Sequence, residues 1–219
     1  ALRARIRGAT LAPAVEAWLA AQAQRPAATL VTALPGLVQR VAARLGKEVE
    51  LTIEGGDLAI DPARLGPVVR ELCHLVRNAV DHGIEPPGER GPKAPTGHVT
   101  VRFERVDGDD QITIVDDGRG MDADALARRA DAVGVGHTAH SRSQRLALAM
   151  VDGVSTAAEV SEVSGRGIGL SAVKAAVTRV GGKIRLSSAP GAGTTIELRI
   201  PGGFVATLPR PSASSGSAT

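Results

Sequence analysis

The stretch Glu71-Leu-Cys-His-Leu-Val-Arg-Asn-Ala-Val-Asp-His-Gly83 decides the fold. Counted at about 100° per residue, its apolar side chains fall on one side of a helix and predict a face packed in a core. His74, Asn78 and Asp81 fall on the other side, within roughly 60° of one another, and Gly83 ends the helix. Two interpretations of this polar face stay open: the solvated side of an ordinary amphipathic helix, or a site.

The sequence also predicts where this central helix begins. Asp61 is a good N-cap residue, and Pro62 suits the first helical position. The dipeptide Gly66-Pro67 leaves open a regular helix that begins one turn later, because proline cannot donate a backbone hydrogen bond.

The composition limits the class of protein. The chain has 219 residues, 43% of them hydrophobic, but Trp18, Phe103 and Phe204 are its only aromatic residues. The core is therefore aliphatic, and base-stacking platforms for nucleic acid are disfavoured. The formal charge of +3 does not by itself indicate a nucleic-acid or membrane partner. The single cysteine and the lack of any run long enough to span a bilayer favour a cytoplasmic location.

Segments on both sides of the central helix predict alternating helices and strands. A strand pair is joined by the turn Asp107-Gly108-Asp109-Asp110, a strong hairpin signal. The predicted elements are a helix over 34–45, a strand over 48–54, strands over 98–105 and 111–115, a helix over 122–133, a helix from 170, and a closing hairpin over 183–188 and 194–200. This order predicts an α+β fold, a two-layer sandwich with helices on one face of a mixed sheet.

The polar face of the central helix is the first of three candidate motifs. Asn78 offers a neutral oxygen ligand of the kind that Mg²⁺ accepts. His74, one turn earlier, is placed to contact phosphate or to assist proton transfer. Arg77 and His82 flank the same site.

The second motif is Asp116-x-Gly118-x-Gly120, which follows a predicted strand. An aspartate there can accept a hydrogen bond from an exocyclic amine, and two glycines allow the backbone close to a planar ligand. An acidic hairpin turn or a cation-binding loop is the alternative.

The third motif, Ser164-Gly165-Arg166-Gly167-Ile168-Gly169, opens a helix. Backbone amides at a helix start bind phosphate. The motif is neither a Walker loop, which needs Gly-Lys-Ser/Thr, nor the dinucleotide-binding fingerprint.

In this order and spacing, the three motifs resemble the GHKL ATPase superfamily, which includes gyrase, heat-shock chaperone ATPases, histidine kinases and MutL. The chain most resembles the ATP-binding domain of CheA-type chemotaxis histidine kinases, over roughly residues 30–201. That type shows His-x-x-Arg-Asn-x-x-Asp-His-Gly-Ile-Glu, which stands here at His74 to Glu85. Other similar segments are Glu89-Arg90 with Lys93-x-x-x-Gly97, Val115 to Met121, Val160 to Lys174, and Gly181-Gly182 with Gly191-x-Gly-Thr-Thr195.

The resemblance implies a Bergerat-type fold that binds ATP and Mg²⁺. Asp116 would bind the adenine amino group beside Gly118 and Gly120, and Asn78 would hold Mg²⁺. The remaining implied nucleotide-site residues are His74 and His82 near the phosphates, Arg77 and Asp81 in the same site, Ser164, Gly165, Arg166, Gly167, Ile168 and Gly169 around the triphosphate, and Thr194 or Thr195 at the adenine. The ATP lid would be residues 134–164.

The resemblance also implies a protein histidine kinase that passes the γ-phosphoryl to a histidine on a separate phosphotransfer domain. A response regulator, a CheW-like adaptor, a chemoreceptor and a homodimeric full-length protein are the implied partners and assembly. The expected division is a helical segment over 1–28, the kinase domain over 29–201 and a flexible linker over 202–219. Nucleic-acid-coupled ATPases of the gyrase or MutL type are disfavoured, because His74 replaces their expected glutamate.

One departure from that type keeps an alternative open. The type usually has Phe-x-Pro-Gly-Phe-Ser-Thr in the lid, whereas this chain has Met150-Val-Asp-Gly-Val-Ser-Thr156. The alternative function is a degenerate nucleotide-binding scaffold or regulatory module without kinase activity.

Overall fold

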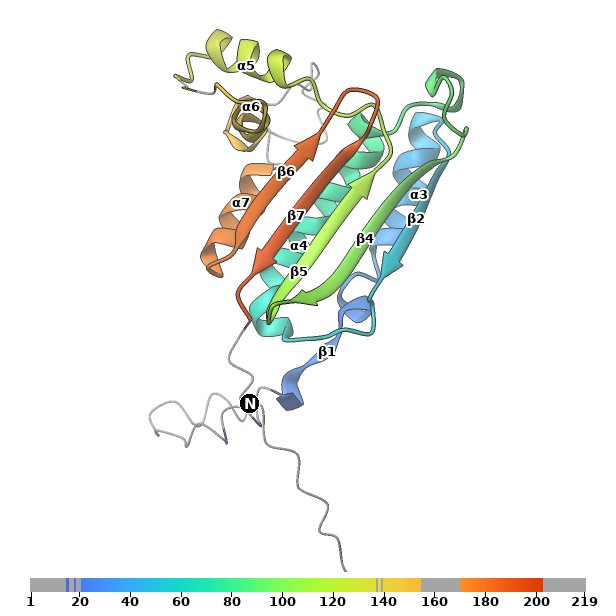
Figure 1. The fold of residues 1–219 in the computed structure, drawn as a ribbon. Helices are drawn as coiled ribbons and strands as arrows, with labels where there is room; N and C mark the ends of the chain where they lie inside the picture. The colour runs from blue at the N-terminus through green and yellow to red at the C-terminus, as the bar shows by residue number, and fades with distance from the viewer. Residues whose placement is uncertain are drawn as a thin grey trace, which may run out of the picture.

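A computed structural model describes residues 15, 18, 21–136, 138, 140–154 and 170–202. Five strands form one sheet, and three helices cover one of its faces (Figure 1). The strands are β2 (Val49–Glu54), β4 (Gly97–Val106), β5 (Asp109–Asp116), β6 (Lys183–Ser188) and β7 (Thr194–Ile200), and the helices are α3 (Leu34–Leu45), α4 (Pro62–Asn78) and α7 (Leu170–Arg179). The predicted α+β sandwich is confirmed.

Further elements surround this sandwich. Helices α5 (Ala123–Ala132) and α6 (Arg142–Ala147) lie together near one end of β6 (Figure 1). A two-stranded pairing joins β1 (Arg25–Pro26) to β3 (Ala59–Ile60). The remaining turns are the 3₁₀ turns η1 (Ala27–Leu30), η3 (Pro87–Glu89) and η4 (Leu148–Met150) and the π turn η2 (Ala79–Gly83).

The sheet is mixed, with the order β2-β4-β5-β7-β6. Strand β2 pairs with β4 in parallel, and every other pairing is antiparallel. The last strand in sequence, β7, lies between β5 and β6. This insertion places Thr194 directly opposite Asp116.

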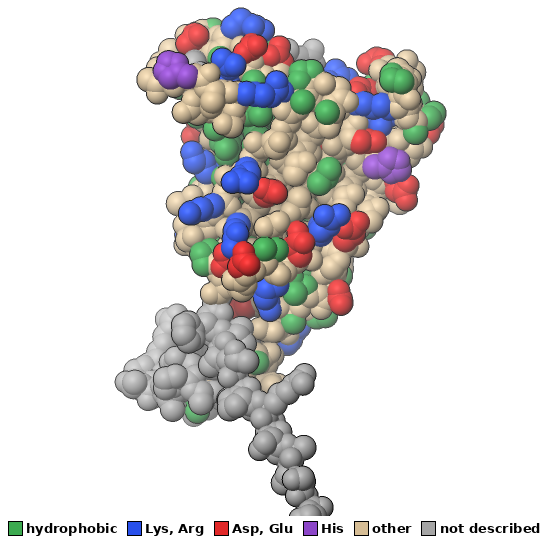
Figure 2. Space-filling model, viewed as in Figure 1, with side chains coloured by type: hydrophobic (Ala, Val, Ile, Leu, Met, Phe, Trp, Pro, Cys, Tyr) green, Lys and Arg blue, Asp and Glu red, His purple; other side chains and the backbone are tan. Residues whose placement is uncertain are grey.

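Alternation along the strands separates the two faces of the sheet. In β4, Val99, Val101 and Phe103 are buried against the helices, whereas His98 and Arg102 are exposed on the other face. Figure 2 shows acidic and basic side chains close together on that open face. One such pair crosses from β4 to β2, with Arg102 Nε 2.5 Å from an oxygen of Glu54. Cross-strand pairs of opposite charge suit a solvated sheet face.

The central helix α4 begins where its cap predicts. The Asp61 carboxylate accepts a hydrogen bond from the backbone N–H of Ala63 at 2.9 Å, and Pro62 follows as the first helical residue. A later start after Gly66-Pro67 is not observed, because Pro67 lies inside the continuous helix. The apolar face is buried as predicted: Leu65, Val68, Val69, Leu72, Leu75 and Val76.

The helical path that begins with α4 ends at Gly83 as predicted, but its last turn differs from a regular α-helix. After Asn78 the chain widens into the π turn η2, in which the N–H of Ile84 bonds the carbonyl of Ala79 at 2.7 Å. A π turn closes over five residues instead of four. The regular helical spacing that put Asp81 in register with His74 and Asn78 therefore does not hold beyond Asn78.

The hairpin between β4 and β5 turns at the predicted place but is tighter than predicted, because Asp109 and Asp110 already belong to β5. Asp107 and Gly108 both have positive φ angles, 52° and 83°, as a type I′ turn requires. The predicted glycine motif over 164–169 lies outside the described residues, as do most of segment 1–28 and nearly all of 202–219.

Candidate functional site

Asp116, the last residue of β5, provides a buried carboxylate. It is 7% exposed, and its Oδ1 accepts a hydrogen bond from the N–H of Gly118 at 3.0 Å. Burial raises the pKa of Asp116 to about 6, although the backbone N–H groups of Gly118 and Thr194 favour the charged form. The nearby acids Asp117 and Glu85 push this pKa upward as well. A carboxylate with so few donors is suited to accept a hydrogen bond from a ligand amine.

The two glycines of this motif are required by packing. A Cβ at Gly118 would lie 2.2 Å from the carbonyl oxygen of Gly83, and one at Gly120 would lie 2.0 Å from that of Ala189. Gly120 also has a φ angle of 70°. The Arg119 N–H donates to the Gly83 oxygen at 2.9 Å. The loop after β5 is therefore pressed directly onto the end of the central helix.

The polar residues of α4 and η2 are accessible. The side chains of His74 and His82 are 49% and 55% exposed, and Arg77, Asn78 and Asp81 are half-buried. His74 Nε2 lies 3.9 Å from Glu71 Oε2, and His82 Nδ1 lies 3.9 Å from Asp81 Oδ1. The structure thus keeps these predicted site residues at one helix end.

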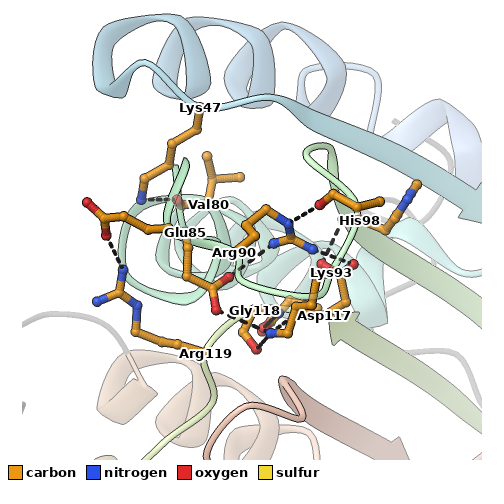
Figure 3. A network of polar contacts seen from close by, with 12 residues as sticks. Lys47, Val80, Glu85, Arg90, Lys93, His98, Asp117, Gly118 and Arg119 are labelled. Atoms are coloured by element: carbon orange, nitrogen blue, oxygen red, sulfur yellow. Dashed lines mark hydrogen bonds and ion pairs between the residues drawn. The ribbon is translucent and has the colours of Figure 1, made fainter. Parts of the chain in front are cut away.

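Lys47, which sequence analysis missed, holds this helix end. Its ammonium group donates to the carbonyl oxygens of Val80 at 2.8 Å and Asp81 at 2.5 Å (Figure 3). Burial lowers the pKa of Lys47, and Asp81 opposes that shift. A cation at the carboxyl end of a helix is favourable, because the last carbonyl groups lack helical partners.

Sequence analysis also missed a polar network that joins the loop over 84–97 to the Asp116 loop (Figure 3). Arg90 is the centre of this network, and its side chain is 0% exposed. It donates to the Ala94 carbonyl at 2.6 Å, to Glu85 at 3.0 Å and to Asp117 at 2.8 Å. Charged residues in a proline-rich loop were the one signal that sequence offered.

Of the two candidate threonines, Thr194 lies on the same side of the sheet as Asp116. It is buried, and its hydroxyl lies 3.1 Å from that of Ser188. Ser188 also donates to the Gly193 carbonyl at 2.7 Å and accepts from the Met121 N–H at 2.8 Å. Thr195 follows Thr194 within β7, so its side chain points to the other face of the sheet.

The described part of the predicted lid contains regular structure. Ser141 and Gln144 form a capping box at the start of α6, and Arg142 donates to the Ser188 carbonyl at 2.8 Å. Met150 and Val154, which stand where the CheA type has phenylalanines, are 9% and 0% exposed. The smaller side chains therefore still anchor this segment in the core.

The described residues offer few side-chain ligands for a magnesium ion. Within the described residues, no cluster of three or more His, Cys, Asp or Glu side chains is arranged to hold a metal. In the same part of the chain, the side-chain amide of Asn78 forms no hydrogen bond, so its oxygen is available. One neutral oxygen plus phosphate oxygens and waters is a donor set that fits Mg²⁺.

The helices of the described ranges are all too short or too polar to cross a lipid bilayer.

Residues 61–203 match the family described as "Histidine kinase-, DNA gyrase B-, and HSP90-like ATPase". The chain is 41% identical over 183 residues to the gliding motility regulatory protein of Myxococcus xanthus, covering 80% of this chain and 23% of that protein. It is 35% identical over 170 residues to the chemotaxis protein CheA of Klebsiella aerogenes, covering 76% and 26%. The chain thus spans about a quarter of the length of these relatives.

Among solved structures, full-length ShkA in complex with AMPPNP is similar, with a TM-score of 0.50 at 18% identity. The match covers 90% of this chain and 33% of that chain, and at this identity it shows the fold alone. The resemblance predicted from the three motifs is confirmed by these comparisons. The chain belongs to the histidine kinase-, DNA gyrase B- and HSP90-like ATPase family, and its curated relatives include CheA proteins.

Proposed function

We propose that this domain binds Mg-ATP and is the catalytic domain of a CheA-like protein histidine kinase. The γ-phosphoryl group of ATP passes to a histidine on a separate phosphotransfer domain, and from there to a response regulator in chemotaxis-type signalling. The observation that carries the proposal is the buried carboxylate of Asp116, which lies beside the end of the helix that bears Asn78. Relatives named CheA support it.

In this proposal the chain binds and orients ATP, and it does little covalent chemistry. Asp116 accepts a hydrogen bond from the adenine amine, and Thr194 lines the same side. Asn78 holds Mg²⁺, which supplies charge neutralisation at the phosphates when it is bound. The remaining nucleotide contacts are His74 and His82 near the phosphates, Arg77 and Asp81 beside them in the site, and the backbone amides of 164–169 around the triphosphate. Positioning of this kind accounts for most of the catalysis in phosphoryl transfer.

The assignments that go beyond this domain rest on the resemblance to the full-length relatives. A CheW-like adaptor, a chemoreceptor, a homodimeric assembly and a cytoplasmic location are part of the proposal. So is the division into a helical segment over 1–28, a kinase domain over 29–201 and a linker over 202–219.

A scaffold that kept the fold without kinase activity is the second candidate. The observation that favours it is the loss of both lid phenylalanines at Met150 and Val154. The burial of both replacements weighs against it, because the lid keeps its apolar anchors.

Calorimetric titration of the chain with Mg-ATP, beside the Asp116→Ala variant, tests the proposal. The parent should bind and the variant should not. Asp109→Ala is the matched control, because Asp109 begins the same strand at its far end and should leave binding intact. A phosphorylation assay with a histidine phosphotransfer domain then separates the kinase from the scaffold. A parent chain that binds no Mg-ATP would contradict the proposal.

A further inference from the structure

The loop over 84–97 forms a charge-balanced cluster with the backbone that follows β5. Lys93 Nζ lies 3.2 Å from Glu85 Oε1, and the other Glu85 oxygen accepts from Arg90 at 3.0 Å. Asp117 completes the cluster through Arg90 (Figure 3). Two cations and two carboxylates thus meet around the buried side chains of Arg90 and Glu85, which are 0% and 10% exposed. Burial of these two charges is favourable only when each of them is paired.

Lys93 also binds the backbone that follows Asp116, the carboxylate of the proposed nucleotide site. Its ammonium group donates to the carbonyl oxygens of Asp117 at 2.8 Å and Gly118 at 2.6 Å. The Asp117 carbonyl and the Gly118 N–H belong to one peptide unit, and that N–H donates to Asp116 Oδ1. A continuous hydrogen-bonded path therefore runs from the Lys93 ammonium through one peptide group to the Asp116 carboxylate.

The other side of this peptide is fixed as well. The Asp117 carboxylate accepts from the His98 N–H at 2.9 Å, and the Asp117 N–H donates to the His98 carbonyl at 3.2 Å. With Arg90 on its second oxygen, Asp117 is held on both sides. The remaining freedom of the peptide is rotation of its plane, and Lys93 opposes that rotation by holding the carbonyl oxygen.

We propose that Lys93 is a positioning residue that orients the Asp117–Gly118 peptide, and through it the Asp116 carboxylate, for recognition of the adenine amine. Arg90 supports Lys93 by holding Glu85 and Asp117. This inference rests on the proposed binding of ATP by Asp116. Hydrogen bonds in such a chain polarise one another, so a cation on the carbonyl also strengthens the N–H that faces Asp116.

The test compares two nucleotides that differ only in the amine: ATP and purine riboside 5′-triphosphate, each with Mg²⁺. The parent should bind ATP at least about 10-fold more tightly, because the analogue leaves the buried carboxylate without a partner. In Lys93→Met, the Kd for ATP should rise by about 10-fold while the Kd for the analogue stays nearly unchanged. A general loss of structure would weaken both nucleotides alike.

Two further variants complete the experiment. Lys183→Met is the matched control, because Lys183 is an exposed lysine of β6 far from this loop, and it should keep the parent's preference. Lys93→Arg should restore part of the preference, because a guanidinium group can also donate to two carbonyl oxygens. If Lys93→Met does not fold, the nucleotide preference of Lys93→Arg is compared with that of the parent instead.

The outcomes separate the two proposals. A parent that binds both nucleotides equally well would overturn the amine contact of Asp116, and this inference with it. A parent that prefers ATP, beside folded Lys93 variants with the same preference, would overturn the role of Lys93 alone.

Discussion

Gly83 lies close beside Asp116: a Cβ atom added to Gly83 would be 3.1 Å from Oδ1 of Asp116. The end of the helix that carries Asn78 therefore abuts the carboxylate at the end of β5. The proposed magnesium ligand and the proposed adenine acceptor are joined through this one glycine. Disturbing the contact should affect both halves of the site.

Gly118→Ala should disrupt this junction, because the new Cβ would lie 2.2 Å from the Gly83 carbonyl oxygen. Overpacking against backbone should cost about 2 kcal/mol of stability or more, and Mg-ATP affinity should fall with it. Gly88→Ala is the control, since nothing lies within 4 Å of its added Cβ. Thermal unfolding and calorimetry would measure both effects; a Gly118→Ala variant as stable as Gly88→Ala would refute the packing argument.

Asp116→Asn should stabilise the nucleotide-free domain at neutral pH. The pKa of Asp116 rises from 3.8 to about 6 on folding, so the folded state holds this proton more tightly than the unfolded chain. Its contribution to the free energy of unfolding therefore falls as the pH rises through this window, by up to about 3 kcal/mol. Asparagine avoids that loss. Denaturant unfolding at about pH 7.5 should show the gain, and near pH 4 it should vanish; an equal gain at both values would contradict the burial argument.

Mg-ATP affinity should depend on pH through the same group. The ionised carboxylate accepts the adenine amine, so affinity should fall by roughly 10-fold for each pH unit below about 6. Asp117 and Glu85, the acids that face Asp116, add to its raised pKa. Titrations of Asp116→Asn at the same pH values provide the control, because they cancel protonation of the nucleotide phosphates. Parallel pH profiles for the parent and the variant would show that Asp116 does not bind the base.

Asn78→Ala should abolish phosphoryl transfer and weaken ATP binding to a smaller extent. The amide is a proposed ligand of Mg²⁺, whereas the base and most phosphate contacts come from other residues. The side chain is half-buried and forms no hydrogen bond within the described ranges, so the variant should fold normally. Transfer assays across a Mg²⁺ titration check this, and full transfer in excess Mg²⁺ would make the metal assignment wrong.

Sequence patterns predicted the sandwich because each main element has its own local signal. The apolar stripe of α4, the cap at Asp61 and the turn at Asp107-Gly108 all depend on neighbours a few residues away. The widening after Asn78 was not predictable in this way. The widened turn is contacted by Lys47, a residue far away in sequence that donates hydrogen bonds to two of its carbonyl groups.

The candidate site was predicted only in part, for a similar reason. Asp116 and Asn78 stand in recognisable motifs, whereas the roles of Arg90 and Lys93 depend on which carbonyl and carboxylate oxygens surround them. The choice between Thr194 and Thr195 needed the register of β7 against β5. Proline-rich loops have no periodicity from which such contacts can be deduced.

The position of β7 between β5 and β6 has a consequence for biosynthesis. Asp116 leaves the ribosome long before Thr194, its partner across the sheet, so β5 keeps an unpaired edge until nearly the whole domain has been made. Pairing between segments so distant in sequence is slow to form, and an open edge is prone to aggregation. Completion of the proposed nucleotide site would therefore coincide with closure of the sheet, and ATP binding would report that a newly made chain has finished folding.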